Sequence, residues 1–214
     1  MCDKMVNSKE EHSSKKAPQK LFDDASFIES CIDGNRENLE KLARACLPSV
    51  RKLVYLGYGN RPDTEDVTQK VLVVLFRDLP TLKKPTAFRQ WLYRVTCNVI
   101  YSHGARRSRW QSIFFSDAEM DAHPSHYKNI SPEKQAAQTQ VFERVSTHLE
   151  KIKHRKRMAV ILSTFFGYVD SEIADIVGCS TETAKKRVQA GRKELINSIR
   201  KDPRLRLLME EAAL

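Results

Sequence analysis

Residues 170–195, DSEIADIVGCSTETAKKRVQAGRKEL, combine basic, hydroxyl and amide side chains at helical spacing. The sequence predicts two short helices here, joined by a tight turn at Gly178. An apolar stripe on the second helix, at i, i+4, i+7 and i+11, consists of Ala184, Val188, Gly191 and Leu195. The side chains that can bind phosphate or a base edge from outside this stripe are Ser180, Thr181, Thr183, Lys185, Lys186, Arg187, Gln189 and Arg192. This pattern is typical of a helix-turn-helix whose second helix enters the major groove of duplex DNA.

A second set of candidate residues lies on a helix predicted over residues 86–106. One side of it is predicted core and carries Phe88, Trp91, Leu92, Val95 and Val99. Another face carries Gln90, Arg94, Asn98 and Tyr101, and it is followed by Arg106, Arg107 and Arg109. Arginines can hold phosphates while planar side chains stack on bases, which suits single-stranded or partly melted nucleic acid. An equally consistent interpretation is that the aromatic residues border the core and the arginines form a solvated cap.

The helix predicted before it, over residues 63–78, is apolar on nearly every side. Asp63 or Thr64 can cap its start, where the negative charges of Glu65 and Asp66 interact favourably with the helix dipole. So broad an apolar surface exceeds what one small core requires, and it suits docking on a partner. A central helix that is buried on several sides would show the same pattern, so both interpretations stay open.

The charge of the chain also favours a polyanionic partner. The 214 residues have a formal net charge of +10, and residues 144–206 carry 15 Lys or Arg against 7 Asp or Glu, a net of +8. Five scattered cysteines without a C-x-x-C motif indicate free thiols in a reducing cytoplasm. No apolar run is long enough for membrane insertion, and the polar N-terminus does not resemble a secretory signal.

The order of these segments predicts an all-α fold of two small helical domains on a flexible linker, the second with the helix-turn-helix. We expect a disordered tail over residues 1–21, a helical domain over 22–111, a polar, proline-bearing linker over 112–135, a second domain over 136–203 and a short tail over 204–214. Loops are predicted at residues 57–63 and 79–85.

In this order, DTEDVTQKVLVVLFRDL, AFRQWLYRVTCNVIYSHGARR and SEIADIVGCSTETAKKRVQAGRKEL resemble the extracytoplasmic-function group of bacterial RNA polymerase sigma factors. The resemblance covers residues 22–200 and is carried most specifically by the W-L-Y-R-x-x-x-N run behind a D-x-x-Q helix. It implies region 2-like and region 4-like domains that bind core RNA polymerase and promoter DNA. The first domain would melt and read the minus-10 element, and the second would read the minus-35 element as duplex. The interval between the domains leaves no room for the extra middle domain of housekeeping sigma factors.

The resemblance also implies roles for particular residues. The polymerase-binding surface would consist of Asp66, Val67, Gln69, Val73 and Phe76. The minus-10 residues would be Leu82, Lys83, Lys84, Arg94, Asn98, Tyr101, Arg106 and Arg107, with the loop around Leu82 capturing an extruded base. The residues from Ser180 to Arg192 identified above would read the minus-35 element. Members of this group are commonly held by an anti-sigma protein, which the resemblance therefore implies as a further partner.

Some residues depart from the family pattern. Ala184 replaces a β-branched residue, Ala190 stands where a basic residue is common, and Gly191 lies inside a helix at a cost of about 1 kcal/mol against Ala. The loop LPTLKKP also lacks an aromatic residue. These departures leave the promoter sequence unpredictable, whereas the predicted fold is unaffected.

Two other classes of protein have to be weighed. A transcriptional regulator would bind duplex DNA through the helix-turn-helix without polymerase. A recombinase or nuclease would need a carboxylate cluster or a Ser or Tyr nucleophile among basic catalytic groups, and the sequence has none at recognisable spacing. His123 and His126 form an H-x-x-H in a polar segment without nearby cysteines, which does not predict a metal site. We therefore expect a protein without catalytic activity, metal or cofactor.

Overall fold

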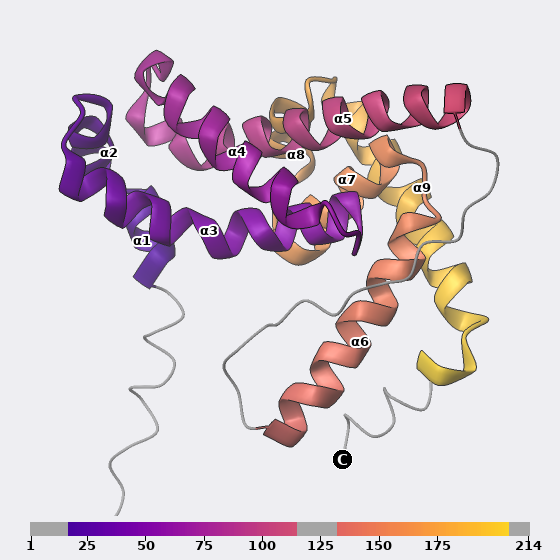
Figure 1. Cartoon of the computed structure of the whole chain (residues 1–214). Helices are drawn as coiled ribbons and strands as arrows, with labels where there is room; N and C mark the ends of the chain where they lie inside the picture. Colours follow the sequence, from indigo (N-terminus) through magenta and orange to yellow (C-terminus); the bar gives the residue numbers. More distant parts are fainter. Residues whose placement is uncertain (1–16, 115–131, 206–214) are drawn as a thin grey trace, which may run out of the picture.

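The computed structural model describes residues 17–114 and 132–205, with side chains described for residues 20–104 and 140–205 (Figure 1). Within these ranges every regular element is an α-helix or a short 3-10 turn, which confirms the predicted all-α fold. The first domain consists of α1 (Ala17–Phe22), α2 (Ala25–Ile32), α3 (Arg36–Tyr58), α4 (Thr64–Asp78), η1 (Leu79–Thr81), η2 (Pro85–Ala87) and α5 (Phe88–Phe114). The second consists of α6 (Pro132–Glu150), α7 (His154–Phe166), α8 (Asp170–Val177) and α9 (Thr181–Arg200). None of the described helices is long and apolar enough to cross a membrane.

Side chains at the helix starts decide where α2 and α3 begin. The carboxylate of Asp24 accepts the backbone N–H of Phe27, and the amide oxygen of Asn35 accepts that of Asn38, each at 3.1 Å. The start of α4 lacks the side-chain cap that we expected from Asp63. Asp63 accepts the Tyr58 hydroxyl at 2.6 Å, and the Thr64 hydroxyl donates to the Gly59 carbonyl at 2.8 Å, so both residues fasten the preceding loop.

The core of the first domain lies between α3, α4 and α5. Their inward residues are fully or almost fully buried: Leu42, Cys46, Val50, Leu53, Val54, Val67, Val71, Leu75, Phe88, Leu92 and Ile100. The α1 helix adds to this core, because Phe22 is buried with its ring centroid 5.6 Å from that of Phe88. All of this helix except Phe22 falls within residues 1–21, where we expected a disordered tail, because so short a helix has no readable periodicity.

The second domain is built around the contact of α9 with α7 and α8. The predicted inner stripe of α9 is confirmed, since Ala184, Val188, Gly191 and Leu195 are all buried. The predicted turn also forms at Gly178, which ends α8 with φ +65°, a conformation that glycine adopts without strain. A Cβ at Gly191 would lie 2.5 Å from Val160 Cγ2 and 3.1 Å from the Lys156 carbonyl oxygen. The glycine inside α9 therefore permits the close approach of α7.

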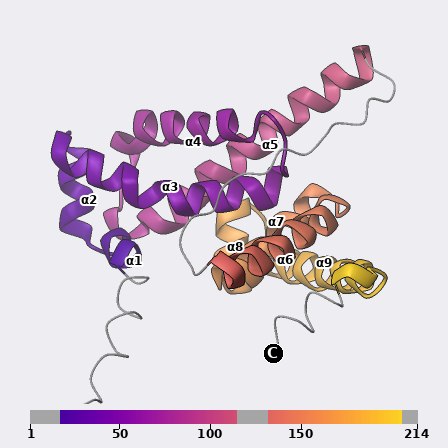
Figure 2. The ribbon, with the colours of Figure 1, turned by 60° about the horizontal axis from the view of Figure 1, so that its bottom comes forward.

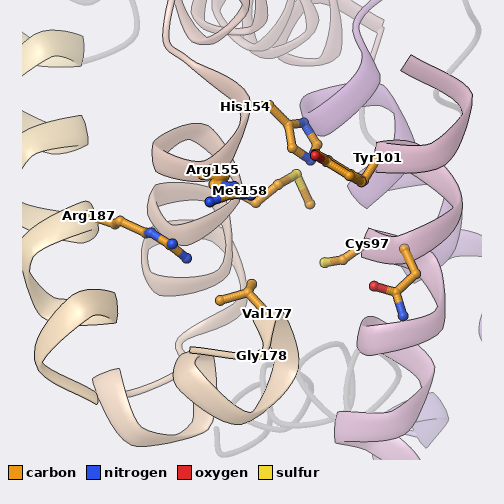
Figure 3. Close-up of a pocket in the computed structure, with 9 residues that line it drawn as sticks. Cys97, Tyr101, His154, Arg155, Met158, Val177, Gly178 and Arg187 are labelled. Carbon is orange, nitrogen blue, oxygen red and sulfur yellow. The ribbon is translucent and has the colours of Figure 1, made fainter. Parts of the chain in front are cut away.

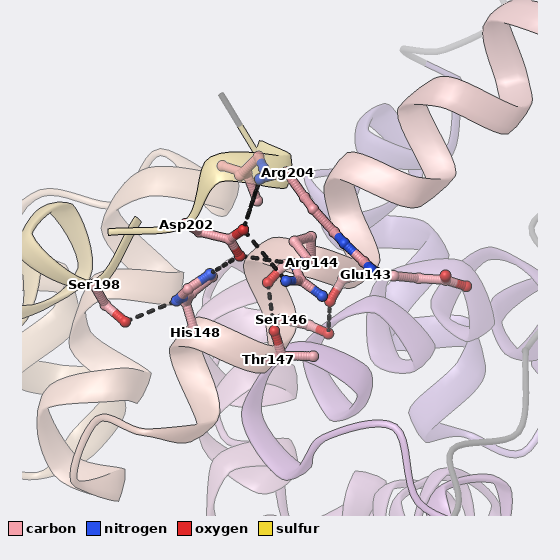
Figure 4. A network of polar contacts seen from close by, with 9 residues as sticks. Glu143, Arg144, Ser146, Thr147, His148, Ser198, Asp202 and Arg204 are labelled. Atoms are coloured by element: carbon pink, nitrogen blue, oxygen red, sulfur yellow. Dashed lines mark hydrogen bonds and ion pairs between the residues drawn. The ribbon is translucent and has the colours of Figure 1, made fainter. Parts of the chain in front are cut away.

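A buried polar cluster fastens the end of α9 to α6 (Figure 4). His148 lies between the Ser198 hydroxyl and the Asp202 carboxylate, with 2.7 Å on each side. The same carboxylate accepts the Arg144 guanidinium at 2.7 Å and the backbone N–H of Arg204 at 3.1 Å. These bonds, first from Arg144 and then from His148, hold the pKa of Asp202 well below its usual range. The Ser–His–Asp order resembles that of a hydrolase, but the carboxylate here caps the final turn and joins two helices.

The two domains pack directly against each other. Figure 2 shows α6–α9 gathered on one side of α3 and α5, where α3 contacts α6 and α7 while α5 contacts α8. A Cβ at Gly57 of α3 would lie 2.8 Å from the Met158 sulfur of α7, so the helices meet at a glycine. The helices also extend beyond the expected boundaries, because α5 continues to Phe114 and α6 begins at Pro132, both inside the predicted linker.

Candidate nucleic-acid interface

The outward face of α9 carries most of the predicted duplex readers. Ser180 caps the helix by accepting the Thr183 backbone N–H at 3.2 Å, and the two hydroxyls lie 2.8 Å apart. The exposed members of the predicted set are Ser180, Thr181, Lys185, Lys186, Gln189 and Arg192, with Thr183 half-buried. Lys186 lies 3.4 Å from the Glu182 carboxylate, and Arg192 donates to the Ser163 hydroxyl at 2.8 Å. Cations and an amide on one exposed face can bind phosphates and base edges together.

Arg187 lies apart from this face and points toward the first domain (Figure 3). It lines a cavity of about 290 Å³ between the two domains. The α5 helix contributes Cys97, Asn98 and Tyr101 to this cavity, and α7 contributes His154, Arg155 and Met158. Among the described residues neither Arg155 nor Arg187 has an ion-pair partner. One predicted minus-35 residue thus shares a cavity with two predicted minus-10 residues.

Burial at this cavity keeps His154 and Cys97 in their uncharged forms. Burial, and then the positive charges of Arg157 and Arg155, lower the pKa of His154 to about 4. His154 is therefore neutral at pH 7, with its ring centroid 5.4 Å from that of Tyr101. Burial raises the pKa of Cys97 to about 12, so this cysteine is an unreactive packing group.

The outward face of α5 also meets the second domain. Arg94, Asn98 and Tyr101 are exposed along it, with 51% of Tyr101 accessible. The Arg94 guanidinium donates to the carbonyl of Asp175 in α8 at 2.7 Å. Arg94 and Asn98 line a cavity of about 520 Å³ together with the end of α8 and the turn from Val177 to Cys179. Of the other predicted minus-10 residues on this helix, Arg106 and Arg107 have side chains outside the described part of the chain.

The loop between α4 and α5 presents a smaller basic surface. Leu82 is half-buried and packs against the core, while Lys83 and Lys84 are exposed. Thr81 fastens the start of the loop by donating to the Asp78 carbonyl at 2.6 Å. The lysines can reach a phosphate, whereas Leu82 offers only a partly accessible apolar contact for a base.

The α4 helix divides the predicted polymerase-binding set into two groups. Asp66 and Gln69 are exposed, and Val73 is 67% accessible, the largest exposure among the described large apolar side chains. Phe76 is partly buried against the core. The prediction that Val67 lies on this surface is wrong. Val67 is fully buried because its face of α4 packs inside the first domain. The exposed polymerase-binding candidates are therefore Asp66, Gln69 and Val73, which we call the α4 face.

Contacts that the sequence did not predict hold the domains together. The Lys52 ammonium lies 3.5 Å from the Phe165 carbonyl oxygen and 5.7 and 5.3 Å from the ring centroids of Phe165 and Phe166. We call these three residues the interdomain clasp. Burial lowers the pKa of Lys52. Tyr93 packs beside the clasp, with its ring centroid 4.9 Å from that of Phe166. The only sequence feature that could have indicated these contacts is the apolar run at residues 165–168, and it does not show which residues it packs against.

Arg157 forms a second connection near the end of α3. Its guanidinium donates across the interface to the Gly57 carbonyl at 3.1 Å and within its own domain to the Glu150 carbonyl at 2.7 Å. The Glu150 carboxylate in turn lies 3.8 Å from the Arg61 guanidinium of the first domain. Polar and aromatic contacts therefore join the domains along the C-terminal part of α3 and the loop that follows it.

Comparison with known proteins identifies the class. Residues 42–110 match the family sigma-70 region 2. The chain is 27% identical over 161 residues to the ECF RNA polymerase sigma factor SigE of Mycolicibacterium smegmatis, which covers 73% of this chain and 59% of the relative. It is 23% identical over 180 residues to the ECF RNA polymerase sigma-E factor of Haemophilus influenzae, covering 82% and 95% of the two chains. The corresponding factor of Escherichia coli K12 is 27% identical over 182 residues, covering 82% and 94%.

Two solved structures share the fold. The sigma factor RpoE in complex with the anti-sigma factor NepR, from Bartonella quintana, has a TM-score of 0.61 at 20% identity and covers 78% of this chain and 99% of that one. CnrH in complex with the cytosolic domain of CnrY has a TM-score of 0.58 at 21% identity and covers 84% and 99%. Both matches extend over the two helical domains.

A region 2 domain followed by a helix-turn-helix domain defines a sigma factor, the class of protein that directs promoter-specific transcription. Within that class, the relatives that the chain resembles over most of its length are extracytoplasmic-function sigma factors, and the chain is similar to that group.

Proposed function

We propose that this protein binds core RNA polymerase through the α4 face and directs it to promoters that α5 and α9 recognise. The observation that carries the proposal is the presence, in one chain, of an exposed α4 face of mixed character and two separate candidate DNA-binding faces. Asp66 and Gln69 beside the accessible Val73 give a surface that can bury an apolar group while its polar residues set the orientation.

In the first domain, Arg94, Asn98 and Tyr101 are the proposed minus-10 residues. The guanidinium would hold a phosphate, the amide can bond to a base edge, and the exposed phenol ring can stack on an unpaired base. Lys83 and Lys84, together with Arg106 and Arg107, would extend the phosphate contacts. These groups favour a melted strand, because unpaired bases expose the edges and faces that they can bind.

In the second domain, α9 is the proposed minus-35 reader. Lys185, Gln189 and Arg192 project from its exposed face, and the Ser180 cap leaves the beginning of the helix at the surface. A recognition helix places its first turns nearest the base edges in the major groove. Arg187 would join this set once the second domain moves away from α5.

The proposed partners are core RNA polymerase, promoter DNA and an anti-sigma protein. The names of the similar proteins associate them with RNA polymerase, and the solved structure of RpoE holds the anti-sigma factor NepR. We place the protein in the cytoplasm, where these partners and reduced thiols are found, and we assign it no catalytic activity of its own.

Run-off transcription on fragments of the native genome tests the proposal. Purified protein with core polymerase should give discrete transcripts that core polymerase alone does not give. A helix-turn-helix regulator would instead bind a duplex site tightly without polymerase. Absence of promoter-specific transcripts from every fragment would contradict the proposed function.

A further inference from the structure

The cavity of about 290 Å³ between α5, α7 and α9 has a positively charged end. Arg155 of α7 and Arg187 of α9 both line it, and Arg187 points from α9 into this space (Figure 3). Among the described residues neither guanidinium has an ion-pair partner, and none of the described residues that line the cavity is an Asp or Glu. Two like charges without a counterion repel each other, so this end of the cavity favours an anion.

The acidic side chains of the same helices do not supply that counterion. The α7 helix, His154–Phe166, contains no Asp or Glu. On α9, Glu182 lies 3.4 Å from the Lys186 ammonium, and Glu194 accepts the Lys156 ammonium at 2.5 Å. The anion that would neutralise this end of the cavity therefore has to come from outside these two helices.

The other end of the cavity is aromatic. The ring centroids of Tyr101 and His154 lie 5.4 Å apart, and Figure 3 shows both rings on the side of the cavity away from Arg187. Tyr101 is 51% accessible, so part of its ring is open to a ligand. His154 is uncharged at pH 7, because burial and two arginines lower its pKa to about 4. A neutral aromatic surface of this kind can stack on a nucleic-acid base.

Asn98 adds a side chain that can recognise a base edge. It lines the same cavity, and its amide both donates and accepts hydrogen bonds. An Asn amide can bond to the N6 and N7 edge of adenine with two hydrogen bonds. The cavity volume lies at the lower end of the range of about 300–1,000 Å³ for small-molecule pockets. Its size and lining therefore suit a ligand that carries a phosphate at one end and a purine at the other.

We propose that this cavity is a binding site for a purine nucleotide, in which Arg155 and Arg187 hold the phosphate and Tyr101 stacks on the base. Asn98 bonds to the edge of the base. A free nucleotide and the terminal nucleotide of a single strand share this chemistry, so the experiments below distinguish the two sources.

Arg155 separates this site from the candidate DNA-binding surfaces. Asn98, Tyr101 and Arg187 are also proposed promoter contacts, whereas Arg155 belongs to neither set. A bound nucleotide would occupy three groups that promoter DNA also uses, so the two ligands would compete. The inference goes beyond the proposed function, because the site requires neither polymerase nor a promoter.

Calorimetric titration of the full chain, without DNA or polymerase, tests the phosphate end. Adenosine 5′-monophosphate should bind at least about tenfold more tightly than adenosine or inorganic phosphate, because each of these fills one end only. Arg155→Ala should weaken binding of the nucleotide by about tenfold, since it removes charge-assisted hydrogen bonds. Arg200→Ala, which removes the same charge at an exposed position of α9, should match the parent chain.

Two outcomes of this titration would overturn the site. Equal affinity for the nucleotide and for inorganic phosphate would leave an anion site without recognition of a base. Equal affinity of Arg155→Ala and Arg200→Ala would place the nucleotide elsewhere on the chain. Circular dichroism checks that both variants are folded.

The aromatic end is tested by two replacements of Tyr101. Tyr101→Phe keeps the ring and should bind adenosine 5′-monophosphate as the parent does. Tyr101→Leu removes the ring and should weaken binding by about fivefold or more. If Tyr101→Leu binds as tightly as Tyr101→Phe, the base does not stack on this ring and the assignment is overturned.

A short 5′-phosphorylated deoxyadenosine strand distinguishes the two sources. If the strand displaces adenosine 5′-monophosphate, binds more tightly and depends on Arg155, the ligand is the end of a strand. If only the mononucleotide depends on Arg155, the ligand is a free nucleotide. Dependence of neither on Arg155 would overturn the inference. Because these titrations omit polymerase, failure to bind a nucleotide leaves the proposed function standing, and a failed transcription assay leaves the nucleotide site standing.

Discussion

Gly191 of α9 lies against Val160 of α7 so closely that a Cβ at position 191 would stand 2.5 Å from the Val160 Cγ2 atom. Gly191→Ala should lower the free energy of unfolding by about 1–3 kcal/mol, because overpacking outweighs the gain of about 1 kcal/mol in helix propensity. Gly104→Ala in α5 is the matched control, since a Cβ there meets nothing within 4 Å. It should be neutral or stabilising by up to about 1 kcal/mol. Urea denaturation of both variants measures these changes. A higher free energy of unfolding for Gly191→Ala than for the parent would contradict the close approach of α7 and α9.

The α4 face should determine affinity for core polymerase. Replacing Asp66 and Gln69 together by Ala should weaken binding while helicity stays unchanged, because both side chains are exposed. Val67→Ala should leave the affinity nearly unchanged and instead lower stability by about 2 kcal/mol, because Val67 is fully buried. Binding titrations with labelled protein and thermal unfolding separate the two effects. Unaltered affinity of the double variant would remove Asp66 and Gln69 from the interface.

The residues of α9 should divide into base readers and phosphate contacts. In the complex with core polymerase, Arg187→Ala should reduce discrimination between the cognate minus-35 sequence and a mutated one by about 1–3 kcal/mol. Lys185→Ala should weaken binding to both sequences about equally and lower the slope of log affinity against log salt by about one. Competition binding at several salt concentrations measures both quantities. If Arg187→Ala lowers the affinity for both sequences equally, Arg187 is a phosphate contact. If the affinity for neither sequence changes, Arg187 lies outside the interface.

The low pKa of His154 should make stability depend on pH. Its pKa is about 6.5 in an unfolded chain and about 4 here, so the unfolded state binds the proton more tightly. Stability from this group is fully present above pH 6.5 and is lost as the pH falls toward 4, by at most about 3 kcal/mol. The groups facing it include the Tyr101 ring and the cations of Arg155 and Arg157.

His154→Gln isolates this contribution from that of the carboxylates. The difference in unfolding free energy between the parent and the variant should shrink between pH 7 and pH 4. A difference that stays constant over this range would show that His154 titrates near its ordinary pKa in the folded protein.

Local patterns in the sequence determined much of the architecture. The stripe from Ala184 to Leu195 is buried as predicted, and Gly178 forms the turn, because helical periodicity and a left-handed residue depend on neighbours within a few positions. The same reasoning correctly predicted α4 up to Asp78 and the buried stripe of Phe88 and Leu92 on α5.

Only the tertiary structure decided which apolar face is covered and which residues meet across the chain. Val67 and Val73 are the same residue type on one helix, yet the packing of α3 and α5 buries the first and leaves the second exposed. Lys52 and Phe165 are 113 positions apart, and Arg94 and Asp175 are 81 apart. Periodicity within a segment defines its faces but carries no information about a distant partner. The meeting of the two candidate DNA-binding surfaces is therefore a property of the folded chain, set by the packing of the second domain against α3 and α5.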